Sequence, residues 1–160
     1  MGQPLERVQE TVRNYILSDD IQRQYPLAYK KWSDAEAMLW SSDSEEKFTT
    51  VGHLCREAFQ EFATYLVEKY QPPNVDENKS HDVARIKAVL AALDPRLGET
   101  EKPFLSALLA YWGTLSDLIQ RQEHGAQKEG EPLVWVDARR VVFQTAILMF
   151  EIDSSLKNLR

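Results

Sequence analysis

The 160-residue chain has little of what anchors a protein in a membrane or cross-links it outside the cell. Its one cysteine, Cys55, excludes a disulfide within the chain and fits a reducing compartment. No apolar run approaches the roughly 20 residues of a membrane-spanning helix. Residues 1–6 show none of the basic and then apolar pattern of a secretory signal. We therefore expect a cytoplasmic protein that has no membrane partner.

The chain also lacks an excess of positive charge. It carries 19 lysines and arginines against 25 aspartates and glutamates, a formal net charge of −6. Because long-range attraction to a phosphate backbone needs a positive field, this balance argues against binding to duplex DNA. Brief contact with a single-stranded RNA through a local basic patch stays open.

Several motifs typical of enzymes are missing as well. The sequence contains no glycine-rich phosphate loop, no Gly-x-Ser-x-Gly, no paired Cys-x-x-Cys and no His-Glu-x-x-His. The chain therefore shows no signature of nucleotide hydrolysis, serine-hydrolase chemistry or a zinc centre, and we expect no cofactor.

What the chain does have is apolar residues at helical spacing along nearly its whole length. Leu105, Leu109 and Trp112 belong to one such apolar face, and residues 141–150 are apolar almost all round. With 43% hydrophobic and 28% charged residues, the composition is that of an ordinary globular protein with one core. We predict an all-α, single-domain bundle of about six helices over residues 1–160, with the apolar C-terminal helix central.

Helix boundaries follow from prolines and capping residues. Ser42 with Glu45 three residues later is a capping-box pattern. The Ser-Asp-Asp run at residues 18–20 is interpreted as the end of the first helix. The predicted helices begin at or just after Pro4, Pro26, Ser42, Ser80, Thr100 and Asp137.

The turn after the fifth predicted helix holds the residues best suited to chemistry, Arg121 and His124. Histidine gives and takes protons near neutral pH, and arginine is always charged and forks onto phosphate oxygens. Beside Gly125, the pair could activate a ribose hydroxyl and stabilise a phosphorane without a metal. The competing interpretation is that Arg121 complements the helix dipole and that His124 is simply solvated.

The segment Leu118–Gly125, the polar loop with Lys128 and the apolar helix from Asp137 together resemble the end of a HEPN-type helical domain. The resemblance covers mainly residues 101–158. Only Gln122 and Glu123 lie between Arg121 and His124, fewer residues than the family usually places there. The resemblance implies metal-independent RNA cleavage by Arg121 and His124 in a toxin–antitoxin or phage-defence setting. It also implies a homodimer whose two motifs face each other, with Gln122 and Glu123 as supporting residues.

A second polar cluster lies on the third predicted helix, where His53, Glu57 and Glu61 share one face and Arg56 is next to Glu57. A metal site would need further ligands from other helices, so an ion-paired face is the preferred interpretation. Arg56 or Glu57 is also a candidate to reach the Arg121–His124 turn and orient it.

Lys128, Arg139 and Arg140 are candidates for a small basic rim that contacts nucleic acid near this turn. The alternative is that they pair with neighbouring acidic residues. The four tryptophans are interpreted as core and interface anchors rather than as a platform for stacked bases. Cys55 lies on an apolar helix face and is expected to be an inert core residue.

Three hypotheses about function follow from these residues. The first is a HEPN-like ribonuclease that acts on RNA through Arg121 and His124. The second is a catalytically silent helical module that binds a protein partner as an adaptor or regulator. The third, a minor one, is a metal-binding bundle that uses His53 and Glu57.

Overall fold

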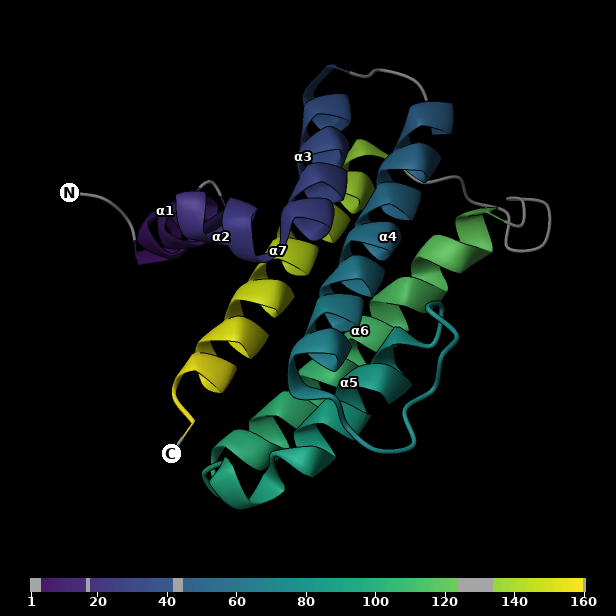
Figure 1. The fold of residues 1–160 in the computed structure, drawn as a ribbon. Coiled ribbons are helices and arrows are strands. Elements are labelled where there is room, and N and C mark those ends of the chain that lie inside the picture. The colour runs from purple at the N-terminus through teal and green to yellow at the C-terminus, as the bar shows by residue number, and fades with distance from the viewer. Residues whose placement is uncertain (1–3, 17, 42–44, 124–133, 160) are drawn as a thin grey trace.

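A computed structural model describes residues 4–16, 18–41, 45–123 and 134–159 (Figure 1). In this part of the chain every regular element is a helix, so the predicted all-α bundle is confirmed. Within the same residues no helix is both long and apolar enough to span a membrane. The elements are α1 (Pro4–Ile16), α2 (Asp19–Gln24), α3 (Pro26–Ser41), α4 (Glu45–Tyr70), α5 (Asp82–Ala92), the 3-10 helix η1 (Asp94–Arg96), α6 (Glu101–Glu123) and α7 (Trp135–Lys157).

Helices α4 and α6 are antiparallel and approach each other closely. The rings of Phe59 and Trp112 are stacked, with centroids 4.1 Å apart. Further toward the start of α4 and the end of α6, Gly52 meets Ile119. A Cβ atom at position 52 would lie 3.1 Å from Cγ2 of Ile119, so the missing side chain lets the two helices come together.

Helices α3 and α7 are antiparallel too, on the other side of α4. The indole Nε1–H of Trp32 donates a hydrogen bond to the carbonyl oxygen of Val142 at 2.9 Å. Toward the end of α3, the ring of Trp40 meets that of Trp135 at the start of α7. The four long helices α3, α4, α6 and α7 therefore alternate in direction, and α5 packs against α4 and α6 (Figure 1).

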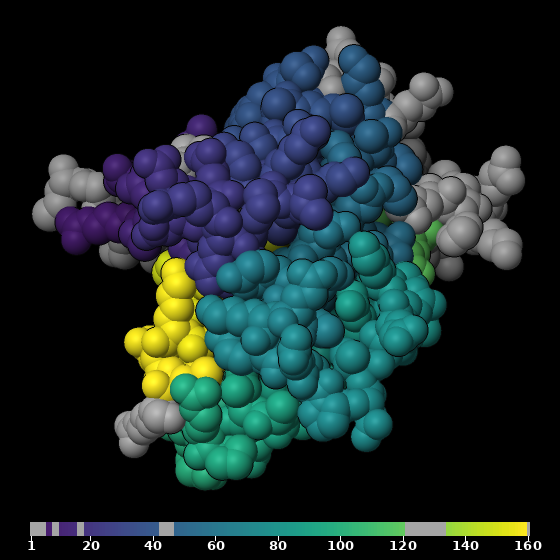
Figure 2. Space-filling model, in the orientation of Figure 1, coloured from purple at the N-terminus to yellow at the C-terminus, as the bar shows by residue number. Residues whose placement is uncertain are grey.

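The core lies around α4 and α7. Helix α4 contacts α3, α5, α6 and α7, and α7 contacts α1, α3, α4 and α6. Only the last part of α7, drawn in yellow, emerges below the N-terminal helices in the space-filling view (Figure 2). The fully buried α4 residues include Val51, Cys55, Phe59, Phe62 and Leu66. Cys55 is thus a core residue as predicted, and its burial raises the pKa of the thiol to about 12.

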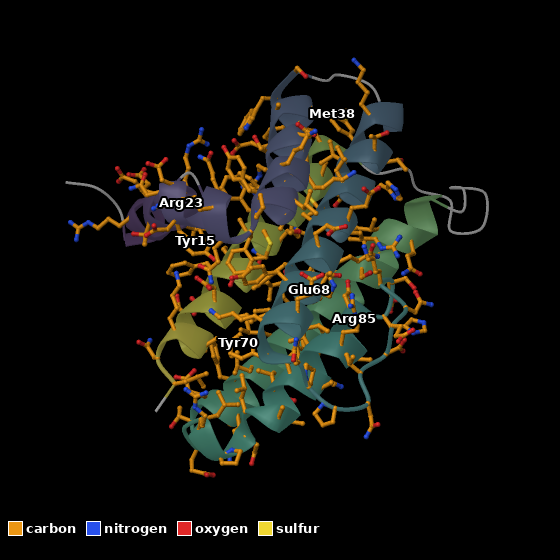
Figure 3. All side chains as sticks on the ribbon, viewed as in Figure 1. Tyr15, Arg23, Met38, Glu68, Tyr70 and Arg85 are labelled. Atoms are coloured by element: carbon orange, nitrogen blue, oxygen red, sulfur yellow. The ribbon has the colours of Figure 1, made fainter. Side chains whose placement is uncertain are left out.

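Two charged residues of α5 are buried against α4 and α6. Asp82 accepts a hydrogen bond from the indole Nε1–H of Trp112 at 3.1 Å, and burial raises the pKa of its carboxyl group. Arg85, labelled in Figure 3, donates from Nη1 to the Thr64 hydroxyl at 2.7 Å. These polar contacts fix the position of α5 between its two neighbours, because leaving either charge without them would be costly.

A buried carboxylate on α7 holds the N-terminal helices in place through hydrogen bonds. Asp153 is 2% exposed, and its Oδ1 accepts a hydrogen bond from the Tyr25 hydroxyl at 2.5 Å. The Lys157 ammonium lies 3.0 Å from the other oxygen and balances the charge. Burial, then the charge of Asp153, raises the pKa values of Tyr15 (Figure 3) and Tyr25, so both phenols stay protonated as donors.

Three predicted boundaries are corrected. Residues 18–20 do not only end the first helix, because the Ser18 hydroxyl caps the additional helix α2 by accepting from the Ile21 N–H at 3.3 Å. Helix α5 follows His81 rather than Ser80. Helix α7 begins at Trp135, and Asp137 lies one turn inside it, where its carboxylate accepts from the Val134 N–H at 3.4 Å.

Candidate functional site at one end of the bundle

Four helix termini meet at the upper end of the bundle in Figure 1. Helix α3 ends there at Ser41 and α4 begins there at Glu45. Helix α6 ends there at Glu123, and α7 begins there at Trp135. We call this region the motif end, because Arg121 lies in the last turn of α6.

Arg121 belongs to the last turn of α6, just beyond the fully buried Ile119. Its side chain, like those of Gln122 and Glu123, falls outside what the structure describes. His124 and Lys128 lie entirely outside the described residues. The structure therefore places the backbone of Arg121 at the motif end and does not test the predicted catalytic pair.

Glu57 contacts one basic residue of α3 and one histidine of its own helix. Its carboxylate lies 2.5 Å from the Lys31 ammonium and 2.6 Å from Nε2 of His53 one turn earlier. The hydrogen bond from Lys31 is the main reason that the pKa of Glu57 is lowered. The predicted ion-paired face is confirmed. Arg56 lies near α5, where its charge helps to oppose the burial that raises the pKa of Asp82.

Among the described residues, no three side chains of His, Cys, Asp or Glu converge as metal ligands. Glu57, one of the two ligands suggested for a metal, is already held by Lys31 and His53. The metal-binding hypothesis thus finds no ligand set in this part of the chain.

Arg139 and Arg140 lie in the first turns of α7 at the motif end. The Arg139 guanidinium is 5.8 Å from the centre of the Phe143 ring, a cation–π contact, and Arg140 is exposed. Neither arginine forms an ion pair with another described residue. The carboxylate of Asp137 serves the backbone of Val134 instead. Positive charge is therefore available here on a chain that is acidic as a whole.

An aromatic surface at the motif end was not singled out from the sequence. Trp40 is 59% exposed, and its ring centroid lies 5.6 Å from that of the half-buried Trp135. Val134 and Val136 beside them are 50% and 49% exposed. We call these four residues the Trp40–Trp135 surface. The run of three large apolar residues at 134–136 is the only feature of the sequence that indicates this surface, and such a run is equally typical of a buried core segment.

No protein-family model, curated protein or solved structure matches the chain. Its function must therefore be inferred from its own residues. The motif end combines an exposed tryptophan with arginines that form no ion pair with the described residues, and tryptophan and arginine are enriched where proteins bind partners. The same guanidinium groups are suited to phosphate oxygens. Both a protein partner and an RNA are chemically compatible with this end.

Proposed function

We propose that the protein is a helical protein-interaction module that docks through the Trp40–Trp135 surface, and that its partner there is a second copy of the chain. The observation that carries this proposal is Trp40, which leaves 59% of its surface exposed although it could have been buried like Trp32. Exposed apolar surface of this kind is costly in water unless a partner covers it.

A second copy fits because an apolar surface is complementary to itself, as the symmetric interface of a homodimer requires. A charged surface would repel its own copy, and the net charge of −6 makes such repulsion general over the rest of the molecule. A dimer formed through the motif end would also bring the C-terminal ends of the two α6 helices nearer to one another. This arrangement agrees with the homodimer that the HEPN resemblance implies.

Sedimentation velocity tests the dimer. The wild-type protein is expected at about twice the monomer mass of 18.5 kDa at micromolar concentration. Trp40→Ala should weaken the dimer by about 30-fold or more, since a tryptophan at the centre of an interface typically contributes at least 2 kcal/mol. Leu27→Ala is the matched control, because Leu27 lies on the same helix and is 60% exposed. A wild-type monomer at every micromolar concentration would refute this proposal.

The second candidate function is metal-independent cleavage of RNA by Arg121 and His124 in a toxin or phage-defence setting. The observation in its favour is the positive charge of Arg139 and Arg140 at the same end of the bundle, which no acidic residue in the described part of the chain pairs with. These arginines can hold a phosphate backbone while Arg121 stabilises the transition state and His124 moves the proton. RNA supplies its own nucleophile, the ribose hydroxyl.

Cleavage of a labelled single-stranded RNA separates the two functions. His124→Ala and Arg121→Ala should each abolish cleavage and any cellular toxicity, with the melting temperature and the dimer unchanged. A chelator should have no effect on the rate. If the purified wild-type protein cleaves no RNA while Trp40→Ala still disrupts the dimer, the protein is an adaptor or regulator without catalytic activity.

A further inference from the structure

A groove lies between α5 and α6, on the half of α6 away from the motif end. It is a half-open groove of about 220 Å³. Each helix contributes one stripe of residues, spaced three or four apart, to its walls. The floor is apolar and is formed mainly by Leu90, Leu97, Leu105 and Leu109. We call this feature the α5–α6 groove.

The volume limits what the groove can hold. A dry cavity of about 150 Å³ accommodates benzene, whereas pockets for drug-sized ligands usually start near 300 Å³. The α5–α6 groove lies between these sizes. It therefore suits one aromatic ring or a short acyl chain, and it is too small for a nucleotide.

The charges at the two ends of the groove differ, because α5 and α6 are antiparallel. At one end the Lys102 ammonium lies 3.3 Å from Asp94 and 3.3 Å from Glu99, and these contacts neutralise it. At the other end Lys87 has no ion pair or hydrogen bond with any described residue. Ser106, on the facing helix, also has an uncommitted hydroxyl within the described part of the chain. The ammonium at one end is thus already paired, and the other end offers a lysine and a hydroxyl that have no partner among the described residues.

We propose that the α5–α6 groove binds small amphipathic carboxylates, of the class of short-chain fatty acids and arylacetic acids. The carboxylate is held by Lys87 and Ser106, and the apolar chain or ring lies over Leu105 and Leu109. At the far end Lys102 is already engaged by two carboxylates, Asp94 and Glu99, so this end gives no site for a second carboxylate, which selects a monocarboxylate over a dicarboxylate. The site is separate from the motif end and does not depend on the function proposed for it.

Titration of the ¹⁵N-labelled protein with phenylacetate and hexanoate, followed by amide chemical shifts, tests the proposal. Saturable shifts should appear in α5 and the first half of α6, with a dissociation constant on the order of 1 mM, as expected of so few ligand atoms. 2-Phenylethanol, which keeps the ring but lacks the carboxylate, should bind about three- to fivefold more weakly, the usual effect of one exposed ion pair.

Two variants and one control make the test specific. Lys87→Gln should weaken phenylacetate about as much as removal of the carboxylate does. Ala91→Phe, which fills the groove from the exposed wall of α5, should abolish the shifts while the circular dichroism stays the same. Lys79→Gln, an equally exposed lysine in the connector before α5, should change nothing. Equal binding of acid and alcohol, or unchanged binding by Lys87→Gln, would overturn the carboxylate site. The absence of saturable shifts in the wild type would overturn it too.

Discussion

Two tryptophans on α3 have opposite environments, although they are only eight residues apart. Trp32 is 3% exposed and donates to the Val142 carbonyl, whereas Trp40 is 59% exposed. Eight residues at about 100° each leave Trp40 rotated by roughly 80° from Trp32, away from the core. Residue type alone predicts burial for both, so the Trp40–Trp135 surface could not be found without the packing of α3 on α7.

Cys55 should be chemically silent in the folded protein. It is fully buried, and burial raises its pKa to about 12, so the thiolate that reacts with disulfide reagents is scarce at pH 8. We expect 5,5′-dithiobis(2-nitrobenzoate) to modify it at least 100-fold more slowly in buffer than in urea, because the reaction has to await unfolding. Equal rates in the two conditions would show that the α4 core opens readily.

The buried Asp82 makes stability depend on pH. Burial raises its pKa, so the folded chain binds this proton more tightly than the unfolded chain does. The stabilising effect is therefore complete below the ordinary aspartate pKa of about 4 and is lost as the pH rises through the raised folded pKa. Asp82→Asn still accepts from Trp112 and has no such titration. Its stability relative to the wild type should increase from pH about 4 to pH about 7.

Urea unfolding of the wild type and Asp82→Asn at several pH values measures this difference. Asp117→Asn is the matched control, since Asp117 is an exposed residue of α6. Its stability difference from the wild type should change much less over the same pH range. Parallel pH profiles for wild type and Asp82→Asn would mean that Asp82 has the same pKa in the folded and unfolded chains.

At the scale of the helices, prolines gave reliable boundaries because their effect is local. Helices begin at Pro4 and Pro26, as predicted, and α4 ends shortly before the Pro72–Pro73 pair. A proline fixes its own φ and restricts the residue before it, whatever packs nearby. Serine and aspartate mark the first residue of a helix less reliably. Ser18 caps a helix that the sequence pattern had not separated, and Asp137 serves the α7 N-terminus from inside the helix.

In the most apolar helix, α7, the sequence pattern alone does not show which face is buried. Its residues 141–150 are apolar nearly all round, and Ile147 looked as suitable a core position as any. In the structure Ile147 is only half-buried, while Ile152, five residues later and on a different face of the helix, is fully buried. Periodicity cannot distinguish the faces of a helix that has almost no polar residues, because the direction of the core depends on its neighbours.

Alanine substitutions at these two positions should separate the faces of α7. Ile152→Ala is expected to reduce the free energy of unfolding by about 2–5 kcal/mol, through lost burial and the cavity left behind. Ile147→Ala should cost clearly less, since its side chain already contacts solvent. Urea denaturation gives both values. A larger loss at Ile147 would mean that a partner, such as the second copy, covers this face of α7.

For the molecule as a whole, the bundle could be predicted from sequence, but the composition of the motif end could be predicted only in part. The sequence put Arg121 in the turn after the fifth predicted helix, whereas it belongs to the last turn of α6, which continues to Glu123 beyond the apolar face that ends at Ile119. The partner of Glu57 could not be predicted from the sequence either, because Lys31 comes from another helix and meets Glu57 only through the packing of α3 on α4. Charged side chains carry no periodic signal that identifies their partners.

Stability should be distributed unevenly over the molecule. The amides of Phe59–Ala63, in the centre of α4 and surrounded by four helices, should exchange with solvent only through global unfolding. Those of α1, which packs mainly against α7 and α2 and reaches α3 through the Arg13–Glu36 ion pair, should exchange faster by local opening. Hydrogen exchange followed by mass spectrometry of peptic fragments measures this order. Equal protection of α1 and α4 would contradict it.

The buried link between Tyr25 and Asp153 also has a consequence for protein synthesis. Its two residues are 128 positions apart, and Tyr15 on α1 likewise packs its ring against Phe150, with centroids 4.8 Å apart. On the ribosome α1 emerges long before α7 exists, so it cannot dock on α7 until that helix has been translated. A nascent chain stalled before Trp135 would leave the Tyr15 ring without Phe150 and Tyr25 without Asp153. Such a chain presents apolar surface that chaperones and proteases recognise.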